Sequence, residues 1–389
     1  MHLETETMLL ENKKVAIIGG GPGGLTLARL LQLKGAAVKV YERDLNREVR
    51  VQGATLDLHQ DSGLKALEEA GLMDAFKATY RPDADKGRII DKHGEILYDE
   101  HTKTANENFN SEGFRPEIDR GPLRNLLLDA LQSDTVVWDS QFVTMSQVDG
   151  AWKLEFKNGA TATADIVIAA DGANSKVRAY VTPIKPVYSG VTIVQGNVPN
   201  AETAAPDIHR LLKGGKIYAH DDGKYLHVSS KGDGSIDFYI SFKKEEHSGI
   251  DFSSRTPVLA WFKREFPGWG GVWLELFENA DLPLFIRPQY CIPFDQTWDA
   301  QSGITLLGDA AHIMPPSGEG VNLAMLDALE LSDCLTGSGF QDIQSAISAY
   351  EKQMRARGAK EAQDSLEMME WMHADGAVNK MAELMGLAG

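Results

Sequence analysis

Three glycines with a fixed spacing stand near the start of the chain, between a predicted strand and a predicted helix. Gly19, Gly21 and Gly24 follow the apolar segment 13–18, and Glu42 comes eighteen positions after Gly24. In that context Gly19 permits a tight turn, Gly21 lets a pyrophosphate approach the backbone, and Gly24 lets the helix pack on the strand. Free N–H groups at the helix start attract phosphate, and Glu42 can accept hydrogen bonds from a ribose hydroxyl. The pattern predicts a bound dinucleotide, FAD or NAD rather than NADP; a glycine-rich turn without a ligand is the alternative.

A second motif places an aspartate at the end of a late strand. The apolar segment 304–307 leads through a glycine into Asp309, and a helix is predicted to begin near Gly320. A carboxylate at a sheet edge suits a polyol such as a ribityl chain, because it accepts two hydroxyl hydrogen bonds. Backbone N–H groups of Gly320, Val321 and Asn322 would stabilise negative charge on a reduced flavin ring. For the Gly-Asp pair alone, a plain turn at the strand end is the alternative.

A third apolar segment, 166–170, delivers Asp171 and Gly172 to the edge of the same predicted sheet. The pair has two interpretations. Its carboxylate either belongs to the cofactor site or accepts backbone N–H groups in an Asx-turn that opens a helix. The sequence leaves both interpretations open.

The elements that position these motifs begin with a β-α-β unit. Segment 13–18, a helix at 25–34 that stops at Gly35, and a strand at 37–41 imply a parallel sheet with a right-handed crossover. The same α/β pattern continues through strands at 135–138, 166–170 and 304–307, a hairpin around 152–159, and helices at 62–78, 123–132 and 320–335.

The pattern changes after Pro183. Between residues 188 and 242 apolar and polar side chains alternate, with Gly-Gly and Asp-Gly turns, which is typical of an antiparallel sheet with one packed face. We therefore predict the α/β class: a Rossmann-type parallel-sheet domain interrupted by an antiparallel-sheet substrate lobe, with a C-terminal helix. The predicted domains are the cofactor domain at 11–75, 102–183 and 285–340, the substrate lobe at 76–101 and 184–284, and a helical segment at 341–389.

Composition argues against several classes of protein. With 39 Lys and Arg against 56 Asp and Glu, the net charge of −17 disfavours nucleic acid and an anionic membrane surface as partners. Two cysteines, Cys291 and Cys334, and scattered histidines give no metal-ligand or redox spacing, so we expect no metal. Neither a signal peptide nor an apolar run of about 18 residues is found, so we expect a cytoplasmic protein.

The motifs, in this order, resemble the single-component (group A) FAD-dependent aromatic hydroxylases. Four segments are similar to the TetX-type tetracycline-inactivating monooxygenases: Val40-Tyr-Glu-Arg-Asp44, Ala54-Thr-Leu-Asp-Leu-His59, Arg115-Pro-Glu-Ile-Asp-Arg120 and Gly308-Asp-Ala-Ala-His-Ile-Met-Pro-Pro316. The resemblance implies tightly but non-covalently bound FAD, and NADPH that docks transiently.

The same resemblance implies roles for particular residues. The expected FAD contacts are Glu42, Arg43, Asp57, Arg120, Asp309 and the backbone near Phe142. Arg50 would help to receive NADPH, although a solvated surface arginine explains it equally well. Arg120 has its own alternative, an ion pair with Asp119 or Glu117.

The substrate region departs from the family pattern. The polar substrate residues of the family align with Gln195, Lys216, Asp237 and Tyr239, where only Gln195 is kept and the others replace arginine, histidine and glycine respectively. Lysine cannot make the planar two-pronged contact of arginine. Ordinary solvent-facing strand residues are the alternative for these positions. The resemblance adds Pro316, Gly318 and the C-terminal helix to the substrate mouth, and His312 is expected to be structural.

The sequence and the resemblance together predict a monomeric FAD-dependent monooxygenase of the EC 1.14.13 type. NADPH would reduce FAD, O2 would add at the flavin C4a to give a hydroperoxide, and a polycyclic, phenolic or enolic small molecule would be hydroxylated; tetracycline-type antibiotics, and hence antibiotic resistance, fall in this class. No protein side chain is expected to be a catalytic group beyond the flavin. A flavin-dependent reductase or oxidase of a small aromatic metabolite without oxygen insertion, and a nucleotide-sensing binding protein, are the alternatives.

Overall fold

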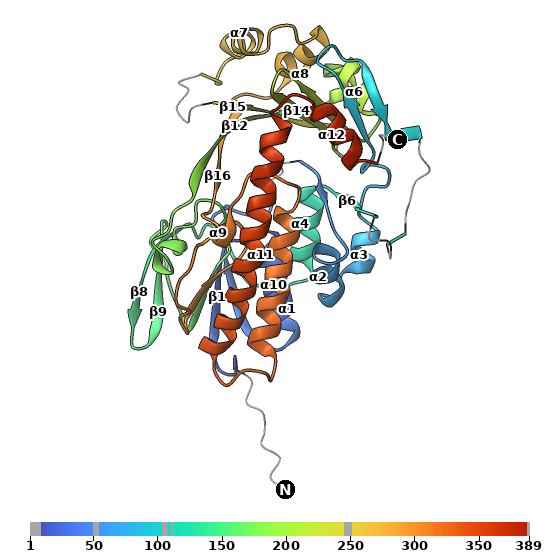
Figure 1. Cartoon of the computed structure of the whole chain (residues 1–389). Coiled ribbons are helices and arrows are strands. Elements are labelled where there is room, and N and C mark those ends of the chain that lie inside the picture. The colour runs from blue at the N-terminus through green and yellow to red at the C-terminus, as the bar shows by residue number, and fades with distance from the viewer. Residues whose placement is uncertain are drawn as a thin grey trace.

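A parallel sheet forms the centre of the lower half of the molecule in Figure 1. The computed structural model describes residues 9–49, 54–102, 108–109, 111, 113–244 and 251–386. In this sheet five strands pair in the order β17-β11-β1-β2-β7, and every pairing is parallel. The strands are β1 (Lys14–Ile18), β2 (Ala37–Tyr41), β7 (Val136–Val137), β11 (Ile166–Ala169) and β17 (Ile304–Leu306). The predicted parallel sheet is confirmed.

Helices cover one face of this sheet and a second, smaller sheet contacts the other. The helices are α1 (Pro22–Leu33), α2 (Gly63–Glu69), α3 (Met73–Lys77), α4 (Arg120–Asp129) and α10 (Gly320–Thr336). The smaller sheet consists of β8 (Phe142–Val148), β9 (Ala151–Phe156) and β10 (Thr161–Ala164). Strands buried on both faces need apolar side chains throughout, which explains the sequence of segment 13–18.

One predicted helix is two. The segment 62–78 forms α2 and α3, separated at Gly71, whose φ of +71° lies in the left-handed region that ends helices. The prediction of one continuous helix was wrong because apolar spacing continues across the break, whereas the backbone direction does not.

A sheet of seven strands forms the upper half of the molecule, in the order β16-β12-β15-β14-β13-β4-β5. Its neighbours are antiparallel except for β13 and β4. The strands are β4 (Gly87–Ile90), β5 (Ile96–Asp99), β12 (Val187–Val198), β13 (Lys216–Asp221), β14 (Lys224–Ser230), β15 (Ile236–Lys243) and β16 (Phe285–Cys291). The sheet extends to Cys291, so the expected domain boundary at residue 285 excluded a strand that belongs to it.

The predicted alternation along β15 is confirmed. Ile236, Phe238, Ile240 and Phe242 enter an apolar core beneath helices, and burying each such side chain contributes about 1.5–3 kcal/mol. The covering helices are α5 (Ala201–Ala204), α6 (Pro206–Leu212), α7 (Arg255–Glu265) and α8 (Leu274–Asn279), seen at the top of Figure 1. Helices α5 and α6 lie between residues 188 and 242, a region that was expected to be all strand. They form there because their apolar side chains pack against the sheet.

The long helix α11 (Ile343–Met372) connects the two halves. Its 30 residues span about 45 Å, from the parallel sheet to the seven-stranded sheet (Figure 1). Asp342 begins it with a capping box, in which Asp342 Oδ1 accepts from Ser345 N at 2.7 Å. Tyr350 and Met354 pack in the lower core, and Met369 and Met372 pack against the upper sheet.

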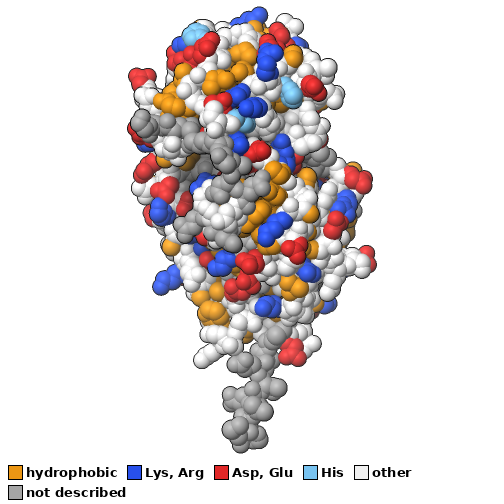
Figure 2. All heavy atoms as spheres, turned by 90° about the vertical axis from the view of Figure 1, so that its right-hand side faces the viewer, with side chains coloured by type: hydrophobic (Ala, Val, Ile, Leu, Met, Phe, Trp, Pro, Cys, Tyr) orange, Lys and Arg blue, Asp and Glu red, His pale blue; other side chains and the backbone are white. Residues whose placement is uncertain are grey.

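The remaining elements are short. They are β3 (Leu56–Asp57), β6 (Glu117–Ile118), α9 (Asp309–His312), α12 (Ala377–Leu384) and the 3₁₀ turns Glu100–Thr102, Val177–Tyr180 and Gly271–Trp273. Within the described ranges no helix is both long and apolar enough to cross a bilayer. On the face that Figure 2 shows, acidic and basic side chains are interspersed rather than separated by sign.

Candidate functional site

The three glycines between β1 and α1 have three different surroundings. A methyl group added at Gly19, where φ is +110°, would lie 2.3 Å from the carbonyl oxygen of Ala170, and one at Gly24 would lie 2.2 Å from that of Gly19. No atom lies within 4 Å of the position of a methyl group at Gly21, where φ is an ordinary −78°. The protein's own packing therefore requires Gly19 and Gly24. Gly21 leaves open space at a helix N-terminus, which fits a diphosphate group.

The carboxylate of Glu42 is fixed beside this turn. Its side chain is buried at the end of β2, where Oε2 accepts from Gly20 N at 2.6 Å and Oε1 accepts from Asp44 N at 3.0 Å. Each oxygen retains a lone pair for a ligand hydroxyl. Arg43, next in the chain, is exposed, and Phe142 is buried at the start of β8.

Asp309 begins α9 directly after the strand β17. Its side chain is open to solvent but recessed, and desolvation by the surrounding protein raises the pKa of the carboxyl group. A methyl group at Gly320 would lie 4.0 Å from Asp309 Oδ1, so the carboxylate lies beside the N-terminus of α10. Asp309 and the helix start at Gly320, the two parts of the second motif, therefore lie side by side.

A buried ionic network holds the turn that carries Asp309. Asp327 Oδ2 accepts from Gly308 N at 2.8 Å and lies 2.6 Å from His312 Nε2, while Oδ1 accepts from Arg357 Nη2 at 2.7 Å. Burial opposes ionisation of Asp327, but the charges of His312 and Arg357 prevail and lower its pKa. The expectation that His312 is structural agrees with this arrangement.

Arg178 connects the Asp171 motif to the Asp309 motif. Its Nη1 donates to the carbonyl oxygens of Ala310 and Ala311 at 3.0 and 2.7 Å. Asp171 Oδ2 accepts from Lys176 N at 2.9 Å, just before the 3₁₀ turn that contains Arg178. The carboxylate of Asp171 thus accepts backbone N–H groups five and six residues on, where the helical turn begins, and its Oδ1 has no hydrogen-bond partner in the part of the chain that the structure describes.

The segment after β3 is tied to the start of α10. Asn322 is fully buried; its Oδ1 accepts from His59 N at 2.9 Å and its Nδ2 donates to Asp57 O at 3.0 Å. The side chain of Asn322 is thus occupied by the protein. Gly320, at the start of the same turn of helix, is exposed.

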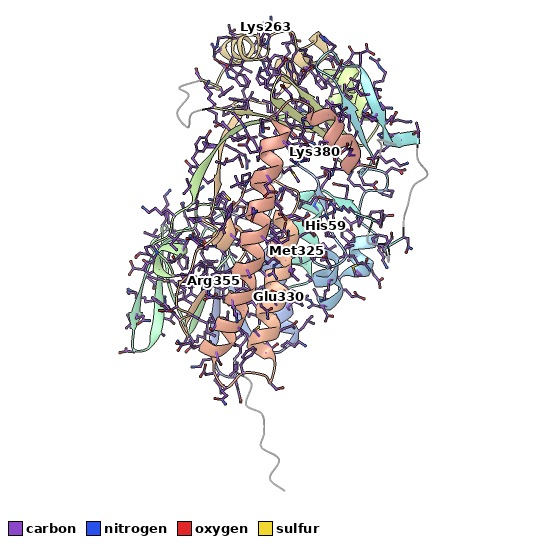
Figure 3. All side chains as sticks on the ribbon, in the orientation of Figure 1. His59, Lys263, Met325, Glu330, Arg355 and Lys380 are labelled. Carbon is purple, nitrogen blue, oxygen red and sulfur yellow. The ribbon has the colours of Figure 1, made fainter. Side chains whose placement is uncertain are left out.

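His59 lies beside α10 (Figure 3), and its ring contacts two carboxylates. Its Nε2 lies 2.9 Å from Asp57 Oδ2, and its Nδ1 lies 3.2 Å from Glu319 Oε2. Burial alone would lower the pKa of His59, but hydrogen bonds to both carboxylates raise it to about 9. Burial would likewise raise the pKa of Asp57, which His59 and Lys216 instead lower to about 2.

This cluster predicts a pH-dependent contribution to stability. The pKa of His59 is about 6.5 when unfolded and about 9 when folded, so its stabilisation is complete below about pH 6.5 and is lost as the pH rises through about 9. We expect His59→Gln to lower the free energy of unfolding by up to about 3 kcal/mol near pH 5.5 and by little near pH 10. Urea unfolding at both pH values measures this.

The matched control is His209→Gln, which alters an exposed histidine on α6. The control should behave as the wild type at both pH values. A His59→Gln variant whose loss of stability is the same at both pH values would show that His59 is not charged in the folded protein.

The four predicted substrate residues share one face of the seven-stranded sheet. Gln195 lies opposite Tyr239, and Gln195 Nε2 donates to Asp237 Oδ2 at 2.8 Å. Asp237 is 3% exposed, and burial raises its pKa to about 6 against the Gln195 hydrogen bond and nearby positive charges. Lys216 forms a buried ion pair with Glu117. The interpretation of the four predicted substrate residues as solvent-facing strand residues was wrong, because other elements cover this face of the sheet.

Aromatic and imidazole rings continue the same face. His227 stacks on Tyr239 with ring centroids 4.9 Å apart, and His220 stacks on Tyr225 at 4.5 Å. Burial lowers the pKa of His227 to about 3 and raises that of Tyr239 to about 12, so both rings are neutral. The end of α11 borders this face, as expected: His373 Nε2 lies 2.9 Å from Ser241 Oγ.

Other predicted residues occupy the loop before α10 and its surroundings. Pro316 and Gly318 are exposed on this loop, Gly318 with φ of +92°, and Ser365 of α11 donates to Pro315 O at 2.5 Å. Arg120 Nε donates to Ala54 O at 3.2 Å. Arg50 lies outside the described residues.

The sequence analysis missed the residues that connect these parts. They are His59, Glu319, Asp327 and Arg178, and the pairing of Lys216 with Glu117 was also not predicted. Two signals were available: His59 and Glu117 stand inside the segments on which the resemblance rests, and charged residues in apolar helices or strands, such as Asp327, need partners.

Comparison with known proteins identifies the family. The model of the FAD binding domain matches residues 12–249 and 297–365 of this chain. The chain belongs to the FAD binding domain family. Monooxygenase penA from Penicillium thymicola is 28% identical to this FAD-binding chain over 408 residues, covering 89% of it and 92% of the relative.

Solved structures share the fold of this chain. HpxO of Klebsiella pneumoniae, complexed with FAD and uric acid, superimposes with a TM-score of 0.76 at 23% identity, covering 97% of this chain and 93% of the other. The tetracycline destructase Tet(51) gives 0.72 at 18% identity, covering 96% and 95%. At these identities the likeness to the destructase is one of fold, and the TetX-type resemblance stays a hypothesis.

Proposed function

We propose that this FAD-binding chain is a monooxygenase that consumes NAD(P)H and hydroxylates a polycyclic, phenolic or enolic small molecule. One observation carries the proposal: Asp57, which lies beside the start of α10, adjoins a covered polar sheet face. Lys216 of that face pairs with Glu117, and its charge acts on Asp57 beside the start of α10. The similarity to monooxygenase penA supports the same reaction class.

Residues of this chain would hold FAD along the length of the cofactor. The diphosphate would occupy the space at Gly21, Glu42 would accept from a ribose hydroxyl, and Asp309 would accept from the ribityl chain. Backbone N–H groups of Gly320 and Val321 would face the ring. Further contacts are proposed for Gly19, Gly24, Arg43, Asp57, Arg120, Phe142 and Asn322, the last as a positioning residue.

When bound, FAD supplies electron transfer from NADPH and activation of O2. The protein supplies orientation and exclusion of water. Met369 and Met372 pack over Tyr225 and close one side of the substrate face, and Gln195 and Asp237 present polar atoms from the sheet. The proposed reaction needs no protein nucleophile, and we assign none among the described side chains.

Tetracyclines are one proposed substrate class among several. Lys216 stands where the family has arginine. Its charge is paired with Glu117, so it is not available to bind a substrate as the arginine would be. Use of NADPH with help from Arg50, a cytoplasmic location and a monomeric state are part of the same proposal.

The decisive experiment combines cofactor consumption with isotope labelling. FAD-loaded protein is mixed with NADPH, ¹⁸O2 and a panel of phenols, polycyclic compounds and tetracyclines, and products are analysed by mass spectrometry. We expect substrate-stimulated NADPH oxidation and one labelled oxygen in the product. Stimulated oxidation that yields only hydrogen peroxide with every compound would instead support a flavin-dependent oxidase or reductase.

A further inference from the structure

The ring of His59 joins the segment after β3 to the start of α10 through two carboxylates. Its Nε2 lies 2.9 Å from Asp57 Oδ2, and its Nδ1 lies 3.2 Å from Glu319 Oε2. An ionised carboxylate accepts hydrogen bonds and cannot donate them, so both ring nitrogens must donate. Only the imidazolium form of histidine donates from both nitrogens. The geometry therefore requires a positive charge on this largely buried ring.

Neutral contacts hold the same two segments together. His59 N donates to Asn322 Oδ1 at 2.9 Å, and Asn322 Nδ2 donates to Asp57 O at 3.0 Å. A methyl group added at Gly318 would lie 3.9 Å from Asp57 Oδ1. These contacts do not change with pH, whereas the contact of the His59 ring with Glu319 depends on the charge of the ring.

Asp57 keeps favourable neighbours whatever the state of His59. Burial would raise its pKa, but the hydrogen bond from His59 and the charges of Lys216 and Arg115 lower it to about 2; Arg115 Nη1 lies 3.9 Å away. A neutral imidazole has one N–H, and the shorter contact, to Asp57, is the one that it would keep. The nitrogen that faces Glu319 would then carry a lone pair.

Glu319, on the other side of the ring, lies close to another carboxyl group. Burial raises the pKa of Glu361 on α11, and the charge of Glu319 raises it further. With His59 neutral, Glu319 would meet the ring's lone pair on one side and like charge on the other. Loss of the His59 charge therefore favours movement of Glu319, and of the start of α10, away from the ring.

The start of α10 is also part of the proposed cofactor site. A methyl group at Gly320 would lie 4.0 Å from Asp309 Oδ1, and Asp57 is a proposed FAD contact on the opposite segment. Separation of the two segments would move apart groups that are proposed to hold one cofactor. A protein that is only partly in its binding-competent form binds its ligand more weakly by that fraction.

We propose that His59 is a positioning residue for FAD: its positive charge holds the start of α10 against the segment after β3, and loss of that charge releases the cofactor. The inference rests on the proposed placement of FAD. It assigns to His59 an effect on cofactor retention, in addition to its effect on folding.

The test is the pH dependence of FAD release from the full-length, FAD-loaded protein. The protein is diluted into buffers from pH 6 to 10, and the fluorescence of free FAD gives the dissociation constant. The pKa of His59 is about 9. We therefore expect a change of less than about twofold from pH 6 to 8 and a rise of at least about tenfold from pH 8 to 10, because a charge-assisted hydrogen bond is lost.

Two variants should remove this step in opposite ways. His59→Gln is neutral at every pH, so it should bind FAD at least about tenfold more weakly at pH 7 and show no step. Glu319→Gln removes the carboxylate that needs the charge, so it should bind FAD tightly at pH 7 and also show no step. A purely structural role for the ring would not give this pair of results.

His209→Gln, an exposed histidine on α6, is the control and should keep the wild-type step. Circular dichroism at each pH separates FAD release from unfolding. A wild type without a step, or a Glu319→Gln variant that keeps it, overturns the inference, and the second comparison decides even if His59→Gln does not fold.

These outcomes separate the inference from the proposed function. Binding of FAD without the step, together with labelled oxygen in a product, would refute the role of His59 and leave the monooxygenase standing. The step without oxygen insertion would do the reverse. Failure to bind FAD at any pH would overturn both.

Discussion

Gly21→Val is expected to fold normally and to lose FAD. The position has an ordinary φ of −78° and no atom within 4 Å of an added methyl group, so a side chain is accepted by the protein itself. That side chain would fill the space left for the diphosphate at the start of α1. We expect FAD affinity to fall about 100-fold or more, which corresponds to about 2.7 kcal/mol. Flavin absorbance of the purified protein, FAD titration and thermal unfolding measure the effect.

Gly24→Ala is the matched control because it is expected to destabilise the fold rather than to block FAD. Its methyl group would lie 2.2 Å from Gly19 O, so the contact between β1 and α1 must open. This variant should unfold at a lower temperature with or without FAD. A Gly21→Val protein that purifies with a full complement of FAD would contradict the placement of the diphosphate.

Asp327→Asn is expected to cost about 3–5 kcal/mol of folding stability. Asp327 is fully buried and pairs with both His312 and Arg357. Removing its charge leaves these cations without a buried partner, which is the expensive way to break an ionic network. Because Gly308 N also donates to Asp327, the turn carrying Asp309 should loosen, and FAD affinity should fall too. Chemical unfolding of the cofactor-free protein measures the stability term.

Glu330→Gln provides the comparison within the same network. Glu330, labelled on α10 in Figure 3, pairs with Arg357 at 2.8 Å, but its side chain is 25% exposed. Its loss should cost about 1 kcal/mol or less, since partly solvated pairs contribute little. Equal effects of the two substitutions would show that burial of Asp327 is not what makes the network stabilising.

The strand, glycine turn and helix at the start of the chain could be predicted from the sequence because their signals are local. The turn of Gly19, Gly21 and Gly24 lies within six consecutive positions, and its strand and helix flank it directly. The alternation along β15 likewise placed Asp237 and Tyr239 on one face. In each case a short segment fixes its own backbone geometry.

The connecting contacts could not be predicted because they depend on pairings between distant segments. Glu117 meets Lys216 across 99 positions, and His59 meets Asn322 across 263. The burial of the polar face depends on where α11 ends, which its own sequence does not state. The break at Gly71 was missed for the opposite reason, since one glycine changes the chain direction without disturbing the apolar spacing.

The helix α11 couples the packing of the lower core to the packing over the seven-stranded sheet. Tyr350 anchors one end deep in the lower core, and Met369, about 30 Å further along, forms part of the wall above the sheet. A rigid helix transmits tilt along its length, so repacking around Tyr350 would change how Met369 and Met372 pack over the seven-stranded sheet, which Tyr350 does not contact. New substrate preferences can therefore arise from substitutions remote from the chemistry.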